Sequence, residues 1–182
     1  MTAIATPTAT WSIDPTHSAI GFAVKHLMLS TVRGTFADIA GSYTVTNDDL
    51  ATATLTAEIG VASINTGVEQ RDTHLRSADF FDAERFPKAT FVSSGMTPAG
   101  DGRWLMSGAL TIRDTTRPVT LTVTPEGRAT DPWGNLKSGW TATTKLERSA
   151  FGLTWNQLLE AGGVAVGNEI TLTLDIQARA DA

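Results

Sequence analysis

The chain has 182 residues, with 14 basic and 19 acidic side chains and a formal net charge of −5 at pH 7. That balance does not predict a basic surface for a phosphate backbone, so nucleic acid is not an expected partner. Cysteine is absent, which excludes disulfides, thiolate-bound metals and a cysteine nucleophile.

The N-terminal segment, MTAIATPTATW, lacks the charged leader and the apolar core of a signal peptide, and no later apolar run is long enough to span a bilayer. We therefore expect a cytoplasmic protein without stable membrane insertion. No linker, internal repeat or low-complexity stretch divides the chain. Its length suits one domain that covers residues 1–182.

Apolar and polar residues alternate with a period of two through most of the chain. Between 51 and 59, for example, alanine, leucine and isoleucine at odd positions alternate with threonine and glutamate at even positions, as in a strand with one buried and one solvated face. Turn-forming residues, such as Asn47-Asp48-Asp49, separate the alternating runs. The pattern predicts strands near 11–13 joined to 18–25, then at 32–45, 51–60, 88–96, 103–113, 118–127, 138–148 and 168–179.

These runs predict an all-β fold, an eight-stranded antiparallel lipocalin-like barrel. Several runs reach about ten residues, roughly 33 Å of strand, which favours a closed barrel over a small sandwich. The interior of such a barrel is filled by its own side chains or holds one small ligand. In 18–26 the large Ile20, Phe22 and Val24 share one face and Gly21 lies on the other. The alternation does not say which face points inward, and Gly21 could equally permit a bend.

The segment 66–87 differs from the rest of the chain because it is densely charged. Nine charged side chains lie between 69 and 88. Thr66 followed by Glu69 forms a capping box, which predicts a helical insert near 66–78. The insert runs into an aromatic corner of Phe80, Phe81 and Phe86, so we expect it to close one end of the barrel as a lid or a plug. A second, short helix is predicted near 152–160.

Arg71 and His74 share a face of the predicted helix. Two such groups could receive an anionic headgroup, a carboxylate or a diphosphate. Alternatively, Arg71 pairs with a nearby acid and only fixes the helix. Asp72 and Arg76, four residues apart, are expected to form a surface ion pair.

The three histidines, His17, His26 and His74, raise the question of a metal site, since three imidazoles can hold a catalytic zinc. His17 and His26 lie nine apart on one predicted strand, which places them on opposite faces, and neither His-x-His nor HExxH spacing occurs. The sequence therefore predicts no metal and no cofactor. It contains neither a Gly-x-Ser-x-Gly elbow nor a Gly-rich phosphate loop.

Five strings occur in order along the chain: WSIDPTHSAIGFAVKHLMLSTVRGTF, RDTHLRSADFFDAERFPKATFVS, LTIRDTTRPVTL, RSAFGLTWN and VGNEITLTLDI. Through these motifs the chain resembles the YceI-like proteins over nearly its whole length. The resemblance implies an extended lipocalin-type barrel that binds polyisoprenoid chains or related amphiphilic lipids, with no firmly attached enzymatic activity, and it makes a homodimer an expectation. Many members begin with a secretion signal, which we do not expect in this chain.

The resemblance carries its motifs onto particular residues of this chain. They are Asp14, His17, Phe22 and His26, then Arg33 and Phe36, then Arg71, His74, Leu75, Phe80, Phe81, Phe86 and Pro87, and finally Phe151, Gly152 and Trp155.

An isoprenoid tail requires a long apolar tunnel, because each Å² hidden from water contributes about 25 cal/mol. The candidate tail-lining residues are Phe22, Val24, Met28, Phe36, Phe81, Trp104, Met106, Trp140, Phe151 and Trp155. The candidate headgroup residues are His17, His26, Arg33, Arg71 and His74. For each tail-lining residue, ordinary core or exterior packing is the competing explanation.

The predicted function is non-catalytic binding, sequestration or transport of a long-chain isoprenoid or similar amphiphilic lipid, such as a polyprenyl diphosphate or an isoprenoid quinone. The alternative is a lipid-modifying or metal-assisted hydrolase that uses His17, His26 and His74. A third possibility is a stress-response protein whose barrel only mediates partner contacts.

Overall fold

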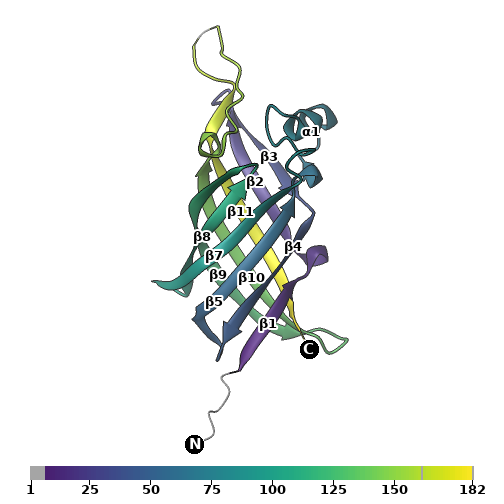
Figure 1. Ribbon diagram of the computed structural model, residues 1–182, viewed down its shortest axis with the longest axis vertical. Coiled ribbons are helices and arrows are strands. Elements are labelled where there is room, and N and C mark those ends of the chain that lie inside the picture. Colours follow the sequence, from purple (N-terminus) through teal and green to yellow (C-terminus); the bar gives the residue numbers. More distant parts are fainter. Residues whose placement is uncertain (1–6, 161, 182) are drawn as a thin grey trace, which may run out of the picture.

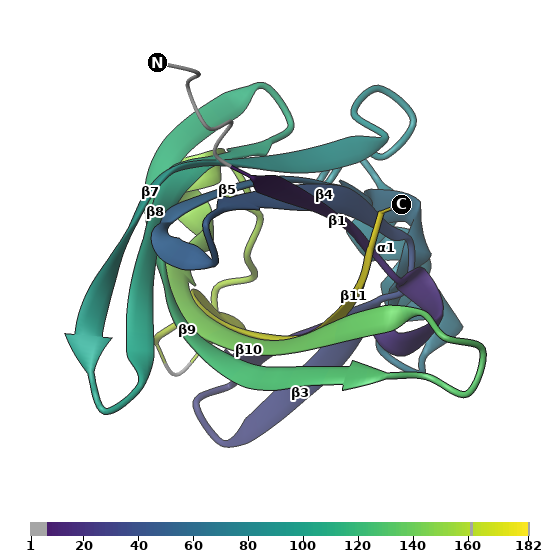
Figure 2. The ribbon, with the colours of Figure 1, turned by 90° about the horizontal axis from the view of Figure 1, so that it is seen from below.

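The computed structural model describes residues 7–160 and 162–181, and its strands form one antiparallel sheet that closes on itself (Figures 1 and 2). The strands are β1 (Thr8–Ile13), β2 (Ala19–His26), β3 (Ser30–Phe36), β4 (Ile39–Thr46), β5 (Asp49–Gly60), β6 (Ile64–Asn65), β7 (Lys88–Gly100), β8 (Arg103–Ile112), β9 (Thr115–Thr130), β10 (Leu136–Glu147) and β11 (Val166–Ala180). One α-helix, α1 (Glu69–Arg76), and short 3-10 turns at Pro15–His17, Val61–Ser63 and Arg148–Phe151 complete the elements of the described residues.

The barrel has eight strands because two pairs of segments each act as one bent strand. β1 and β2 both pair with β11, through Ile13 opposite Ala178 and Ala19 opposite Asp175. β3 and β4 follow each other in the same way, since β3 pairs with β2 and β4 pairs with β1. The remaining neighbours run β4-β5-β7-β8-β9-β10-β11, and the β1–β11 pairing closes the ring. The predicted eight-stranded antiparallel barrel is confirmed.

The predicted strand 32–45 is wrong in one respect, because the structure breaks it between β3 and β4. The backbone N–H groups of Ala37 and Asp38 donate to Ser63 Oγ at 3.1 and 3.0 Å. Two donors that a continuous strand would offer to the strands on its two sides are therefore used by a side chain from the 3-10 turn after β5. The two-residue strand β6 then pairs with β3, and the sequence pattern did not predict it.

The break between β1 and β2 is organised by the carboxylate of Asp14. Its Oδ1 accepts from the backbone N–H of Thr16 at 3.1 Å and from the Thr16 hydroxyl at 2.7 Å. Its Oδ2 accepts from Lys137 Nζ at 2.9 Å and lies 3.0 Å from His17 Nδ1. The hydrogen bond from Thr16, followed by that from Lys137, holds the pKa of Asp14 well below its usual range.

This network predicts an acid sensitivity that can be traced to one residue. A carboxylate with a lowered folded-state pKa stabilises the fold above its unfolded pKa of about 3.9 and loses that contribution as the pH falls through the lowered value. In Asp14→Asn, the difference in unfolding free energy between neutral and strongly acidic pH should therefore shrink, as measured by urea unfolding over a pH series. Asp101→Asn, whose side chain is 88% exposed, is the matched control. Equal acid sensitivity in the parent and in Asp14→Asn would contradict the assignment.

The structure decides which face of β2 points inward. Ile20, Phe22 and Val24 all face the barrel interior. Gly21 lies on the opposite face, where a Cβ atom would come within 2.9 Å of the Thr173 hydroxyl oxygen on β11. The small residue therefore permits a close approach to the neighbouring strand and does not widen the interior.

One end of the barrel is closed by stacked aromatic rings. Trp11, which is 1% exposed, stacks on Tyr43 with ring centroids 5.7 Å apart, and Tyr43 meets Trp140 edge to face at 5.5 Å. The Tyr43 hydroxyl hydrogen-bonds Ser138 Oγ at 2.7 Å. The Arg128 guanidinium lies over the Trp11 ring at 4.9 Å. The interior is therefore sealed by packing at the end where β11 finishes.

Candidate functional site

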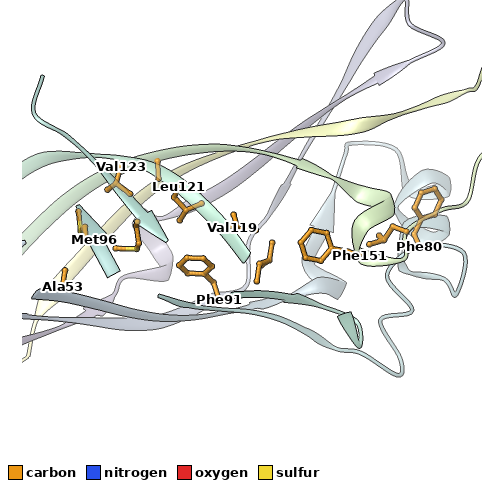
Figure 3. Close-up of a cluster of buried hydrophobic side chains, with 12 residues drawn as sticks. Ala53, Phe80, Phe91, Met96, Val119, Leu121, Val123 and Phe151 are labelled. Carbon is orange, nitrogen blue, oxygen red and sulfur yellow. The ribbon is translucent and has the colours of Figure 1, made fainter. Parts of the chain in front are cut away.

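The interior of the barrel contains a cavity of about 260 Å³ whose wall is apolar. Each strand contributes alternate residues to this wall, as on β5, where Ala53, Leu55, Ala57 and Ile59 point inward. In Figure 3 the side chains of Phe91 and Met96 on β7 point toward those of Leu121 and Val123 on β9. The period-two pattern of the sequence thus becomes a continuous hydrocarbon lining.

Four lining residues carry side-chain nitrogen or oxygen atoms, and the protein itself engages them. Tyr43 and Trp140 both bond to Ser138 Oγ, the latter through its indole N–H at 3.2 Å. The Thr144 hydroxyl donates to the Thr120 carbonyl at 2.8 Å. The Arg148 guanidinium donates to backbone carbonyls. The wall therefore selects for hydrocarbon, because these polar groups already have partners.

Unfilled apolar space inside a protein is energetically unfavourable. Apolar cavities stay dry, since water finds no hydrogen-bond partners in them. At about 24 cal/mol per Å³ of unfilled core, the 260 Å³ correspond to about 6 kcal/mol that a hydrocarbon occupant would recover. The cavity is thus suited to an apolar guest.

The segment after β6 covers the other end of the cavity. Helix α1 lies beside the ends of β2 and β3 (Figure 1). Leu75 of the helix, together with Phe80 and Phe81 after it, lines the cavity. Phe81 meets Phe36 of β3 edge to face at 5.7 Å. The predicted helical insert is therefore present, and its apolar side chains form part of the cavity wall.

The predicted capping box at the start of this helix is wrong. Helix α1 begins at Glu69, and the preceding residue, Val68, makes no side-chain cap. Thr66 is instead bound by Asp72, which is 4% exposed and whose Oδ1 accepts from the Thr66 backbone N–H at 2.9 Å and from its hydroxyl at 2.5 Å. A buried carboxylate one turn into the helix thus takes the place that Glu69 was expected to fill.

The predicted surface pair of Asp72 and Arg76 is also wrong, because Asp72 is buried against Thr66. The guanidinium of Arg76 donates to Glu69 at 3.3 Å and to the backbone carbonyls of Ala62 and Ile64. It therefore ties the helix to the turn that precedes it.

None of the five predicted headgroup residues lines the cavity. His17 lies beside Asp14 at the β1–β2 break, and His26 and Arg33 are exposed on the β2–β3 hairpin. Arg71 donates to the hydroxyl of Thr66 at 2.7 Å and to its carbonyl at 3.1 Å, which is a structural role at the helix start.

His74 lies closest to the wall among these residues. Its ring packs edge to face on Phe80, which lines the cavity, with centroids 5.1 Å apart, and on Trp155 at 4.6 Å. Its Nε2 atom lies 2.8 Å from Asp79 Oδ2.

The structure brings most of the predicted tail residues together. Those in the wall are Phe22, Val24, Phe36, Phe81, Met106, Trp140 and Phe151. The other three lie outside it. Met28 is 68% exposed in the β2–β3 turn, Trp104 packs against the buried cluster without reaching the cavity, and Trp155 packs on His74.

Sequence reasoning missed Arg148, a buried cation at the edge of the cavity. It is 8% exposed and lines the wall with its side chain. Its guanidinium donates to the carbonyls of Gly167 at 2.9 Å, Leu153 at 2.7 Å, Trp155 at 2.9 Å and Val166 at 3.3 Å. Burial lowers the pKa of this guanidinium. The sequence did contain one indication that Arg148 faces the interior, because residue 148 continues the series of inward positions 140, 142, 144 and 146 of β10.

The short helix predicted near 152–160 does not form. A 3-10 turn at Arg148–Phe151 ends at Gly152, which has φ +77°, and residues 153–157 after it form neither helix nor strand. The carbonyls that a helix would use internally instead accept from Arg148, and the side chain of Asn156 pairs with both backbone groups of Val166. Hydrogen bonds from the side chains of Arg148 and Asn156 therefore hold this segment in a non-helical conformation.

The structure does not bring the three histidines together, since they lie at the β1–β2 break, at the end of β2 and in α1. Within the described part of the chain, no group of three or more His, Cys, Asp or Glu side chains is arranged to hold a metal. Among residues 7–160 and 162–181, no helix has the length and apolar character needed to cross a bilayer.

Comparison with known proteins finds relatives along most of the chain. A UPF0312 protein of Vibrio vulnificus is 34% identical over 137 residues, which are 75% of this chain and 72% of the relative. A UPF0312 protein of Photorhabdus laumondii is 36% identical over 135 residues, 74% of this chain and 70% of the relative.

Solved structures share the architecture. Campylobacter jejuni YceI protein is 29% identical, with a TM-score of 0.71 over 87% of this chain and 90% of that chain. Burkholderia cenocepacia BcnA has a TM-score of 0.79 at 24% identity, over 91% of this chain and 98% of that chain. A polyisoprenoid-binding domain from Saccharophagus degradans has a TM-score of 0.66 at 14% identity, over 94% of this chain and 98% of that chain. The last two likenesses show the fold.

A family model described as a YceI-like domain matches residues 11–178. The closed barrel, its apolar interior and this match over nearly the whole length lead to one conclusion: the chain belongs to the YceI-like family.

Proposed function

We propose that this protein binds a long-chain isoprenoid or similar amphiphilic lipid, with its hydrocarbon tail inside the barrel, and performs no chemistry on it. The observation that carries the proposal is the 260 Å³ apolar cavity, whose polar lining groups are bonded within the protein. The shared fold of the polyisoprenoid-binding domain from Saccharophagus degradans supports the same ligand class. Binding would serve sequestration or transport.

The polar head of such a ligand would remain outside the hydrocarbon-lined part of the barrel. Of the residues predicted for the headgroup, His74 is the strongest candidate. Its ring contacts Phe80 in the cavity wall, and its side chain is 38% exposed to solvent. An imidazole can donate to a quinone carbonyl or, when protonated, to a diphosphate. Both headgroups remain within the proposal.

Organic extraction of protein purified from cells, followed by mass spectrometry, tests the proposal. We expect a long apolar molecule in the extract, and native mass spectrometry of the intact protein should report the same mass together with the number of subunits. Added polyprenol should raise the melting temperature of extracted protein and quench tryptophan fluorescence, because Trp140 lines the cavity. An empty extract together with no response to polyprenol would overturn the proposal.

The hydrolase alternative lacks a supporting observation. It needs His17, His26 and His74 to act together, but His17 lies beside Asp14 and His74 beside Asp79, each on its own element. Non-catalytic lipid binding is therefore the function that the geometry supports best.

A further inference from the structure

The turn between β2 and β3 exposes three consecutive apolar side chains. Leu27, Met28 and Leu29 are 37%, 68% and 84% exposed. The loop before β11 reaches the same place, because the backbone N–H of Leu27 donates to the Ala165 carbonyl at 2.8 Å. That loop exposes Leu158 and Val164, 83% and 38% exposed. We call Leu27, Met28, Leu29, Leu158 and Val164 the tip patch; it lies at the upper end of the barrel in Figure 1.

The backbone of this turn does not favour the residues it carries. Leu27 and Met28 have φ of 52° and 57°, and the N–H of Leu29 donates to the His26 carbonyl at 3.0 Å. Two consecutive positive φ angles are typical of a turn that prefers asparagine, aspartate and glycine. The turn between β4 and β5 has nearly the same φ angles, 54° and 57°, and carries Asn47 and Asp48. Bulky apolar side chains are therefore present at the tip against the local preference of the backbone, as happens at functional surfaces.

Cations lie directly behind the tip. Lys25 and Arg33 are exposed, and the register that pairs Ala23 with Arg33 places them on the same face of the hairpin. Among the described residues neither forms an ion pair with an acidic group. No acidic residue occurs between Asp14 and Asp38, although the whole chain carries a net charge of −5. The hairpin thus combines an apolar tip with a local positive charge.

The tip patch lies near one end of the cavity. Val24, three residues before Leu27, lines the cavity, and so does Val166, which pairs with His26 across the sheet. An amphiphile that entered the barrel at this end would pass the exposed leucines and methionine.

We propose that the tip patch docks this end of the barrel onto an anionic phospholipid bilayer. Leu27, Met28 and Leu29 enter the interfacial layer, and Lys25 and Arg33 lie against the lipid phosphates. Exposed apolar side chains next to cations provide the two signals that reversible surface binding requires. Docking does not depend on what occupies the cavity, so it can be tested separately from the proposed function.

The absence of cysteine allows a single probe to be placed on the tip. Leu29→Cys carries a polarity-sensitive fluorophore, and the protein is mixed with phosphatidylcholine vesicles with and without phosphatidylglycerol. Trp133→Cys with the same fluorophore is the matched control, since Trp133 is 83% exposed in the β9–β10 turn, near the opposite end of β11. We expect a blue shift and brighter emission at position 29 with the phosphatidylglycerol vesicles, and no change at position 133.

Substitutions then separate the contribution of the cations to vesicle binding from that of the apolar side chains. Lys25→Gln and Arg33→Gln should each lower vesicle affinity about fivefold, and Met28→Ser with Leu29→Ser should lower it by at least about tenfold. Ala142→Phe, inside the barrel, should dock like the parent. No response at position 29, or an equal response at position 133, would overturn the proposal. So would a response without vesicles that grows with protein concentration, because it would show that a second copy of the chain covers the patch.

Discussion

Replacement of Arg148 by methionine is expected to destabilise the protein by about 3–5 kcal/mol. The guanidinium is 8% exposed and its donors satisfy the carbonyls of Leu153, Trp155, Val166 and Gly167. Methionine would fill a similar volume but remove this donor from the carbonyls of Leu153, Trp155 and Gly167, whereas the Val166 carbonyl keeps its hydrogen bond from Asn156. An unsatisfied buried polar group costs about 1–3 kcal/mol. Urea denaturation followed by tryptophan fluorescence measures the change.

A nearby arginine provides the control for this substitution. Arg117 donates through Nε to the Ala150 carbonyl at 3.1 Å in an exposed position, so Arg117→Met should change the unfolding free energy by no more than about 0.5 kcal/mol. The unfolding free energy of Arg148→Lys should lie between those of the parent and Arg148→Met, because an ammonium is a single compact donor group and cannot reach all four carbonyls. If Arg148→Met were as stable as Arg117→Met, the guanidinium would not be holding the segment 152–160 in place.

Ala142→Phe is expected to weaken binding of a polyprenol about 100-fold while leaving the barrel folded. Ala142 is 8% exposed and lines the cavity on β10. A phenyl ring there occupies space that a hydrocarbon tail would use, and excluding three to four methylenes at about 0.8 kcal/mol each gives this factor. Stability should be retained or increased, since the ring fills part of the apolar cavity.

An alanine on the outer surface makes the comparison specific. Ala109 is exposed on β8 between the inward-facing Gly108 and Leu110, so Ala109→Phe adds the same ring outside the barrel and should bind polyprenol like the parent. Titration of tryptophan quenching gives the dissociation constants, and thermal unfolding reports the stability of each variant. Unchanged affinity in Ala142→Phe would place the ligand away from this part of the interior.

The sequence predicted the number and order of the barrel strands because each strand alternates apolar and polar residues, and this pattern is visible in neighbouring positions of the sequence. The apolar positions of 51–60, for example, reappear as Ala53, Leu55, Ala57 and Ile59 in the wall. Five of the ten predicted tail residues follow the same period of two on strands and line the cavity: Phe22, Val24, Phe36, Met106 and Trp140. The predicted headgroup residues were chosen by charge, which has no such period, and none of them lines the cavity.

Other features depended on contacts between segments far apart in the chain. Ser63 breaks the strand at Ala37 and Asp38, and Asp72 replaces the expected helix cap at Thr66. These interactions use ordinary surface-type residues, whose partners a single sequence does not identify.

The sequence by itself therefore determined the all-β barrel and the apolar character of its alternate positions, since both follow from backbone geometry and side-chain polarity at short range. Only the tertiary structure decided which face of β2 points inward, that residues 152–160 do not form a helix, and that Arg148 is buried. The physical reason is closure of the sheet. When β1 pairs with β11, one face of every strand is enclosed, and the groups enclosed with it must find hydrogen-bond partners wherever the closed ring places them.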